Sequence, residues 1–328
     1  MSEKITAITF GANEPTAEDA RTKALQLISA FKRDKSVSDE SAHYSGVTKI
    51  KVAKDLEDAI SNSSKNTSIK QGNSSLCGPA AFFFPILAKR PDIYTQVVLS
   101  LYKQGEAKLE KLKLKSSTVA RKISTPSIKR IDWMIMSSIK PGYDNPEHQA
   151  SGITWPRNLV KWLEDTGHQV VDKTPPSSTG LDSLLEAQRA YAGGYTVFLL
   201  VHSDLFKASG KSNPSLFPPN HWAVLNSTIK IKKYDPVSKK HKAPAVLSSV
   251  LVRDILEEWG DYEEALEEFN DIDGERFEPP VKINNQILLD VFTWGKRHMP
   301  VFNELSTSRK PEIRNFLRGY YGYIKARR

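Results

Sequence analysis

The chain of 328 residues contains a single cysteine, Cys77. One thiol forms no internal disulfide, and one sulfur is a poor start for a structural zinc site, so the fold must rest on an apolar core. With 39% hydrophobic and 26% charged residues, the composition is that of an ordinary globular chain, long enough for such a core. Cys77 is therefore either a small buried side chain or a nucleophile.

The residues around Cys77 favour the nucleophile. The serines at positions 74 and 75 are suited to cap a helix, Pro79 is tolerated in its first turn, and residues 80–87 form an apolar run. This pattern predicts Cys77 at a helix N-terminus, where the helix dipole and free N–H groups favour a thiolate. Gln71 precedes it across a Gly-Asn-Ser-Ser stretch, so its carboxamide can reach back and donate a hydrogen bond to an oxyanion.

A glutamine six residues before a cysteine that opens an apolar helix resembles the pattern of papain-like cysteine peptidases. The family has a histidine downstream and an aspartate or asparagine after it, and His221 and Asp235 stand in that order. The resemblance implies a Cys77–His221–Asp235 triad with Gln71 in the oxyanion hole. If the segment after Pro236 is an insertion, the returning strand is 286–294 and Asp290 competes with Asp235 for the third position.

Further segments resemble a narrower group, the bacterial papain-like toxins that secretion systems deliver between competing cells. They lie within residues 70–325 and include Cys77-Gly78-Pro79-Ala80-Ala81, Leu101-Tyr102-Lys103-Gln104-Gly105, Ile131-Asp132-Trp133-Met134, Gly152-Ile153-Thr154-Trp155-Pro156, Val291-Phe292-Thr293-Trp294-Gly295 and Phe316-Leu317-Arg318-Gly319-Tyr320-Tyr321-Gly322-Tyr323-Ile324. This resemblance implies a protein substrate in a target cell, a secretion apparatus, and an immunity protein that blocks the cleft in the producer.

The periodicity of the chain predicts an α+β fold, with helices first and strands later. A papain-like fold has this layout: a helical subdomain carries the cysteine and packs on a twisted antiparallel sheet that carries the histidine and aspartate. We expect an N-terminal helical and linker segment at 1–69, serving delivery, inhibition or packing, and a catalytic domain at 70–328. The expected helices are 13–34, 54–61, 77–89, 91–103, 127–138, 155–166, 181–191, 252–269 and 311–326; the expected strands are 47–52, 169–171, 195–202, 222–231 and 287–294.

The expected chemistry is acyl transfer through a covalent thioester, with His221 as base, Asp235 as its orienting group and Gln71 as an oxyanion donor. Peptide-bond cleavage is the leading expectation. Glutamine deamidation or transglutamination, and peptidoglycan amidase activity, use the same triad and stay open at this point. A non-enzymatic binding module with a papain-like fold is the remaining alternative. Trp222 and Trp294 are candidates to shield the histidine from water, or else to pack in the core.

Other classes find less support in the sequence. The net charge is +9, but the basic stretches of the chain are offset by acidic blocks elsewhere in it. We find no nucleic-acid-binding motif, so we do not expect a nucleic-acid partner. The six other histidines lack ligand spacing, and no cofactor or metal is expected. There is no apolar run of membrane-spanning length and no signal-peptide pattern, so we expect synthesis in a cytoplasm and export by a dedicated secretion system.

Overall fold

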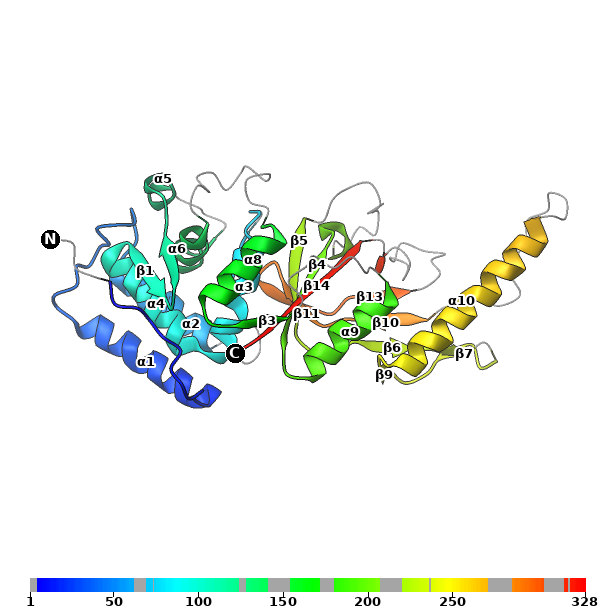
Figure 1. Cartoon of the computed structure of the whole chain (residues 1–328). Helices are drawn as coiled ribbons and strands as arrows, with labels where there is room; N and C mark the ends of the chain where they lie inside the picture. Colours follow the sequence, from blue (N-terminus) through cyan, green and yellow to red (C-terminus); the bar gives the residue numbers. More distant parts are fainter. Residues whose placement is uncertain are drawn as a thin grey trace.

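The computed structural model describes residues 5–61, 69–72, 74–123, 128–140, 154–171, 180–206, 220–235, 237–270, 285–303, 316–317 and 319–328. These residues form a mixed α+β structure with antiparallel sheets, as the sequence predicts. A helical half lies at one end, the sheets lie in the middle, and a long helix extends at the other end (Figure 1). Within the described residues, no helix is both long enough and apolar enough to span a membrane.

The helical half is built around one helix, α3, which is apolar along its whole length. Ten of its residues from Cys77 to Leu87 are buried, and α1, α4, α6 and α8 pack around it. A two-stranded hairpin, β1–β2, extends α4. The bounds are α1 Ala17–Arg33, α2 Lys49–Ser61, α3 Cys77–Lys89, α4 Pro91–Gln104, β1 Glu106–Leu109, β2 Leu112–Lys115, α5 Thr118–Lys122, α6 Arg130–Ile139 and α8 Pro156–Asp165.

The N-terminal helices belong to the same hydrophobic core as α3 and α4. The apolar stripe of α1 faces α4, where Phe31 meets Tyr102 edge-to-face with ring centroids 5.2 Å apart. Thr16 caps α1 by accepting a hydrogen bond from Asp19 N at 3.1 Å. A boundary at 69/70 stays a prediction, and the linker at 62–68 lies outside the described residues.

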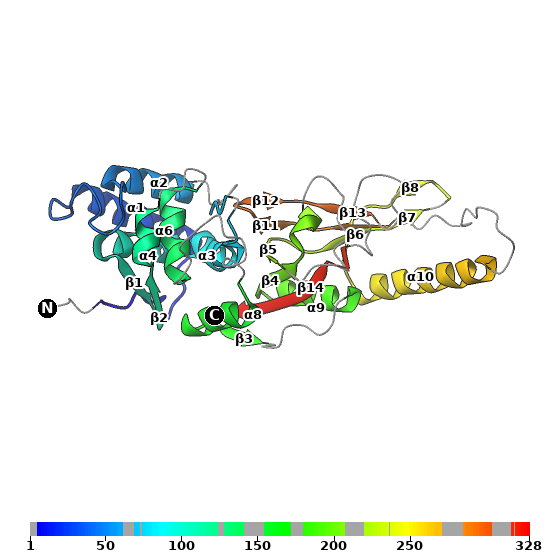
Figure 2. The same cartoon turned by 90° about the horizontal axis from the view of Figure 1, so that it is seen from above.

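The sheet half contains a six-stranded antiparallel sheet in the order β12-β11-β5-β4-β14-β3 and a four-stranded one in the order β13-β10-β6-β9. Three strands of the first sheet lead directly into strands of the second, so the two form a long bent surface (Figure 2). The bounds are β3 Gln169–Val171, β4 Thr196–Val201, β5 His221–Leu225, β6 Lys230–Lys232, β9 Ala245–Val246, β10 Gln286–Leu288, β11 Val291–Thr293, β12 Lys296–His298, β13 Val301–Asn303 and β14 Tyr320–Arg327.

Alternating side chains give the large sheet two buried faces. Phe198, Trp222 and Phe292 pack against the helical half, where Phe84 of α3 stacks on Phe292 with centroids 3.8 Å apart. The intervening residues, such as Leu199, join a second core. Helices α9 (Leu181–Ala192) and α10 (Ser249–Asn270) contribute to that core, with the short 3-10 helix η1 (Ser203–Phe206) and the small hairpin β7 (Tyr234–Asp235)–β8 (Lys240–His241) nearby in sequence.

Four expectations about individual elements are wrong. The predicted helix 311–326 is strand β14 from Tyr320 onward, because its aromatic and β-branched side chains suit a buried strand. The predicted strand 47–52 mostly belongs to α2, which begins at Lys49. The strands predicted at 222–231 and 287–294 are each divided in two at the bend between the sheets.

Candidate active site

Cys77 is the first residue of α3, as the sequence predicts. Pro79 lies in the first helical turn, where its missing N–H costs no hydrogen bond. The N-cap is Leu76, which makes no side-chain capping bond. The expectation that the serine at position 74 or 75 caps the helix is therefore wrong. The first N–H groups of the helix, at Cys77 and Gly78, have no side-chain cap to bond to.

The thiol of Cys77 lies against the backbone on both sides of His221. Its sulfur donates a hydrogen bond to the carbonyl oxygen of Asn220 at 3.8 Å, and the N–H of Trp222 donates to the sulfur. The N–H groups of Cys77 and Gly78 also point to the sulfur. Helix α3 and strand β5, which are distant in sequence, thus bring Cys77 to the position where His221 begins its strand.

Burial dominates the electrostatics of this thiol. Cys77 is 3% exposed, and its burial raises the pKa of the thiol above the ordinary value. Lys140, at the end of α6, acts in the opposite direction through its positive charge, and burial lowers its own pKa to about 8. In this closed arrangement the desolvation of the sulfur outweighs the helix N-terminus, contrary to the expected preference for thiolate.

The imidazole of His221 is oriented by Thr293 on the neighbouring strand β11. His221 Nε2 is hydrogen-bonded to Thr293 Oγ1, and the Thr293 hydroxyl in turn donates to the carbonyl of Trp222 at 3.5 Å. The bond to Thr293 occupies Nε2 and fixes the orientation of the ring. When Nε2 carries the ring proton, the threonine oxygen accepts it and Nδ1 is the nitrogen that can act as a base.

The structure does not bring Asp235 to His221. Asp235 lies in the β7–β8 hairpin, and its carboxylate accepts hydrogen bonds from Val237 N at 3.0 Å and Ser238 Oγ at 2.8 Å. These bonds lower the pKa of this exposed carboxyl and tie it to its own turn. The returning strand next to β5 is β11, which pairs with it in antiparallel register, so a segment distant in sequence takes the place expected for the 230s.

Asp290, the alternative, also faces other groups. It lies just before β11 at the opposite end of β5 from His221, where it forms a two-pronged ion pair with Arg297. Its carboxylate also accepts from Asn226 Nδ2 at 3.3 Å, and these partners lower its pKa. The alternative returning segment, 286–294, does lie beside His221, but the residue that reaches the ring is Thr293.

Gln71 is buried in a tight loop before α3. Its side-chain Nε2 donates to the carbonyl of Ser74 at 3.0 Å, and its own carbonyl accepts from Ser74 N at 3.2 Å. The side chain is therefore fixed by the loop that leads to Cys77. An amide nitrogen carries two hydrogens, and the bond to Ser74 uses one of them.

The two tryptophans have different surroundings. Trp294 lies over the His221 ring with centroids 4.7 Å apart, and Phe206 approaches both rings edge-on. Trp222 points to the other face of β5, where its indole N–H donates to the carbonyl of Thr154 at 2.7 Å. Trp294 is thus the aromatic cover of the imidazole, and Trp222 packs α3 onto the sheet.

Sequence reasoning missed Thr293 and Lys140. Thr293 directly precedes Trp294 in a segment that carries part of the resemblance, but a lone hydroxyl in an apolar strand has no distinguishing pattern. Lys140 ends an apolar helix, where a basic residue is ordinary. Only the packing of β11 on β5, and of α6 on α3, brings them to the site.

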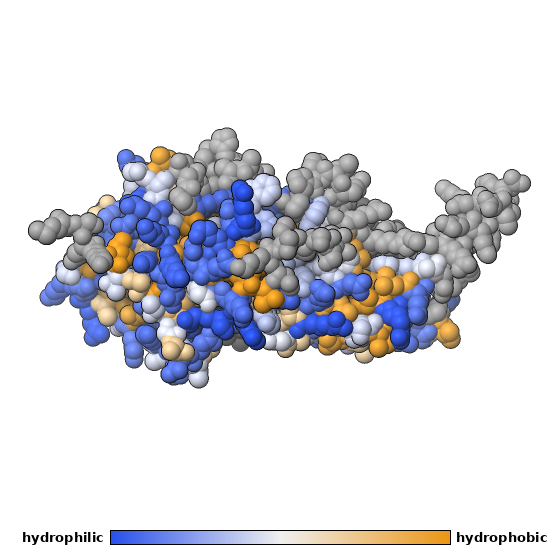
Figure 3. All heavy atoms as spheres, viewed as in Figure 1, coloured by the Kyte–Doolittle hydropathy of each residue, from blue (hydrophilic) through white to orange (hydrophobic). Residues whose placement is uncertain are grey.

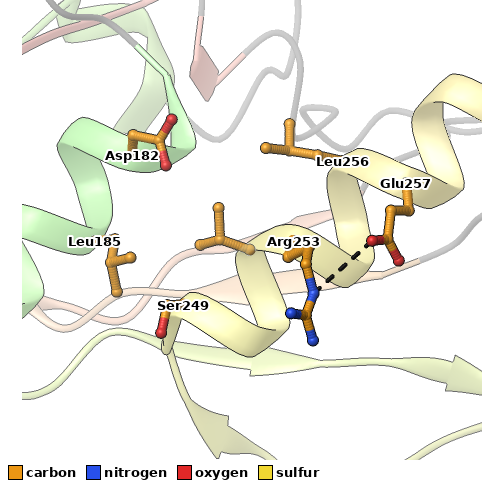
Figure 4. A pocket seen from close by; sticks show the side chains of 7 residues that line it. Asp182, Leu185, Ser249, Arg253, Leu256 and Glu257 are labelled. Atoms are coloured by element: carbon orange, nitrogen blue, oxygen red, sulfur yellow. Dashed lines mark ion pairs between the residues drawn. The ribbon is translucent and has the colours of Figure 1, made fainter.

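Two cavities lie away from Cys77 and His221. One of about 380 Å³ lies where α9 meets α10 and is lined by Asp182, Leu185, Ser249, Val252, Arg253, Leu256 and Glu257. Figure 4 shows the ion pair between Arg253 and Glu257 beside it. Apolar surface is visible over these helices in Figure 3. The other, of about 160 Å³, lies near the end of α3. No cluster of three or more potential metal ligands occurs in the part of the chain that the structure describes.

Comparison of the chain with protein-family models, with curated proteins and with solved structures found no match.

Proposed function

We propose that the protein is a papain-like cysteine hydrolase in which Cys77 attacks an amide carbonyl and His221 is the base. The observation that carries the proposal is the seating of the only thiol, at the start of an apolar helix, between the backbone carbonyl and N–H that flank His221. A buried thiol needs no such neighbour for packing. The hydrogen bond between His221 Nε2 and Thr293 Oγ1, which leaves Nδ1 outside that bond, supports the same conclusion.

The reaction begins with transfer of the Cys77 proton to His221 Nδ1. In the described structure the thiol donates to Asn220 O, so this hydrogen bond must break before the proton moves to the imidazole. The thiolate attacks the carbonyl carbon, and the oxyanion is stabilised by the N–H of Cys77 and the Gln71 amide. The imidazolium protonates the leaving amine, and water attacks the thioester to release the acid.

Thr293 takes the orienting role that the resemblance assigns to an aspartate. A hydroxyl fixes the orientation of the ring but does not supply a negative charge to the imidazolium. We therefore propose Cys77, His221 and Thr293 as the working set, assisted by Lys140. Lys140 supplies the nearby positive charge that opposes the cost of burying the thiolate.

The resemblance extends the proposal to biology. We propose that the chain is an effector toxin, exported by a secretion apparatus, that cleaves a protein in a target bacterium and is held inactive in its producer by an immunity protein at the cleft. Deamidation, transglutamination and amidase activity are alternative outcomes of the same chemistry.

Expression in a bacterial cytoplasm tests the proposal. We expect the wild type to arrest growth and Cys77→Ala and His221→Ala to be harmless, while His241→Ala, in the distant β7–β8 hairpin, stays toxic. Mass spectrometry of the cell proteins then separates new peptide ends from glutamine-to-glutamate changes and peptidoglycan products. A folded wild type whose Cys77 reacts with iodoacetamide yet leaves cells and their proteins unchanged would refute the proposal.

A further inference from the structure

The residue immediately before Gln71 is held by a buried carboxylate. The backbone N–H of Lys70 donates to Asp132 Oδ2 at 2.9 Å. Asp132 lies in the first turn of α6 and is 1% exposed. The peptide unit that leads into Gln71 is therefore attached directly to the helical half.

The β11–β12 turn packs closely against the backbone of residues 69 and 70. Gly295, at the tip of this turn, adopts a positive φ of 77°. A Cβ built on it would lie 2.8 Å from the Ile69 carbonyl oxygen and 2.8 Å from Lys70 Cα. The backbone just before Gln71, at residues 69 and 70, thus lies between α6 and the hairpin that carries Thr293 and Trp294; we call this arrangement the clamp.

Asp132 has few partners for a buried acid. Its Oδ1 accepts from the Tyr94 hydroxyl of α4 at 3.4 Å, a long hydrogen bond. Asp55 of α2 adds a second negative charge, which Lys51 partly offsets at 3.7 Å, and Lys129 adds a positive charge at the start of α6. Burial is the largest influence and raises the pKa of Asp132 to about 7.

Such a group costs stability and is not needed for packing. An amide or an apolar residue of similar size would fill the same volume without a desolvated charge. Its strongest observed contact is with the peptide N–H adjoining Gln71. A buried residue that lowers stability, and that bonds to the backbone next to a proposed site residue such as Gln71, is typical of a functional site.

We propose that Asp132 is a positioning residue for the oxyanion hole: by holding the Lys70 N–H, it fixes the Gln71 carboxamide toward the carbonyl attacked by Cys77. This role rests on the proposed function. It predicts that changes at Asp132 impair steps with an oxyanion and spare the reactivity of the thiol itself.

Two small probes separate these effects without knowledge of the natural substrate. p-Nitrophenyl acetate acylates a thiolate through a tetrahedral oxyanion and releases p-nitrophenolate, whereas iodoacetamide alkylates it by displacement of iodide with no oxyanion. We expect Asp132→Leu to lower the ratio of acylation to alkylation by roughly 100-fold, as for loss of one oxyanion donor. Asp132→Asn, whose carbonyl can still accept from Lys70, should restore most of the ratio.

The stability of Asp132→Asn against urea separates a positioning role from a structural one. If Asp132 served the structure alone, its replacement would lower the stability, whereas we expect it to rise. A carboxyl whose pKa is raised on folding destabilises the protein progressively as pH rises from about 4 to about 7. Asp132→Asn should therefore unfold at higher urea than the wild type at pH 8, with little difference at pH 4. Thr95→Val, which removes a buried, unpartnered hydroxyl of α4 in the described structure, serves as the control and should leave the ratio unchanged.

A double-mutant cycle tests whether Asp132 acts through Gln71. We expect Asp132→Leu to have little further effect on the ratio in a Gln71→Ala background, because the donor that it positions is already absent. Additive losses, or equal losses in acylation and alkylation, would overturn the positioning role while leaving the catalytic proposal intact. A wild type acylated no faster than Cys77→Ala would instead overturn the catalytic proposal, and this role with it.

Discussion

Among single residues, the imidazole of His221 takes its orientation from the hydroxyl of Thr293, while the two aspartates considered from the sequence bond to other groups. A hydroxyl both donates and accepts, so Thr293 can bond to the Trp222 carbonyl and to His221 Nε2 together and hold the ring in one orientation. A carboxylate in the same place would also stabilise an imidazolium by its charge, which a hydroxyl does not.

Substitutions at Thr293 and at Asp235 should therefore have unequal effects. Thr293→Val removes the hydroxyl that bonds to His221 Nε2 and should lower the acylation rate by about 10-fold or more, because a misoriented imidazole is a poorer general base. Thr293→Ser should retain most of the rate, and Asp235→Ala should stay within about twofold of the wild type. Burst kinetics with p-nitrophenyl acetate measure all three. A large loss in Asp235→Ala would restore the aspartate to the triad.

Lys140 gives the site a predictable pH dependence. Burial raises the pKa of Cys77, so the thiolate fraction is small at neutral pH and grows as pH rises, and Lys140 moves that increase to lower pH while it remains charged. Lys140→Gln should therefore shift the alkylation profile with iodoacetamide to higher pH and slow alkylation several-fold at pH 7.

Two variants control this prediction. Lys140→Arg should match the wild type at pH 7, where both side chains are charged, and react faster than the wild type above pH 8, where Lys140 loses its charge and arginine keeps it. Lys89→Gln, at the far end of α3, should have no effect. An unchanged profile in Lys140→Gln would exclude the electrostatic role.

At the level of secondary-structure elements, the hairpin β11–β12 connects the two halves of the site. Its strand β11 supplies Thr293 next to β5, and its turn supplies Trp294 over the His221 ring and Gly295 against residues 69–70. The turn can approach so closely only because Gly295 has no side chain and tolerates a positive φ. One hairpin thus contacts both His221 and the segment that leads to Gln71, the proposed base and oxyanion donor.

Alanine at this turn should disturb both. Gly295→Ala combines an unfavourable φ with a collision against backbone, so we expect about 2–4 kcal/mol of destabilisation and a lower acylation-to-alkylation ratio. Gly167→Ala is the matched control, since Gly167 has a similar φ of 78° but no described atom within 4 Å of the place that an added methyl group would take. It should cost only about 1–2 kcal/mol and leave the ratio unchanged. Equal effects of the two substitutions on stability and ratio would contradict the clamp.

For the molecule as a whole, the N-terminal helices and helix α3, which carries Cys77, share one core. Several tryptophans, among them Trp133 and Trp162, are buried in that core, so tryptophan fluorescence reports its unfolding. A core of this kind transmits the loss of packing in one helix to the others, because the interior is close-packed.

Phe31 in α1 offers a direct measurement. Phe31→Ala removes a buried ring that contacts Tyr102 and should destabilise by about 3–5 kcal/mol. The urea midpoint of unfolding, followed by tryptophan fluorescence, should fall accordingly. Leu25→Ala, which changes an exposed side chain of the same helix, should alter it little. An unchanged urea midpoint in Phe31→Ala would contradict a core shared between α1 and the rest of the helical half.

Much of the local structure follows from the sequence. Helix α3 matches its predicted bounds, with Cys77 at its start, because an apolar run with a proline in its first turn has few other solutions. Strand β3 and helix α4 are likewise anticipated by local patterns. Residue order alone suggests the approach of His221 to Cys77, and the hydrogen bonds around Asn220 and Trp222 agree with it.

Which strands and side chains become neighbours depends on long-range packing, which local sequence patterns do not encode. The sequence places Asp235 next in line after His221, but the strand that pairs with β5 comes from residue 291 onward, so Thr293 occupies the orienting position. The pKa of Cys77 is raised because other segments bury the sulfur, an effect that no property of the helix terminus predicts. Residue identity limits the possible chemistry, and the pairing of distant strands selects the partners, because β-sheet contacts join segments without regard to their separation along the chain.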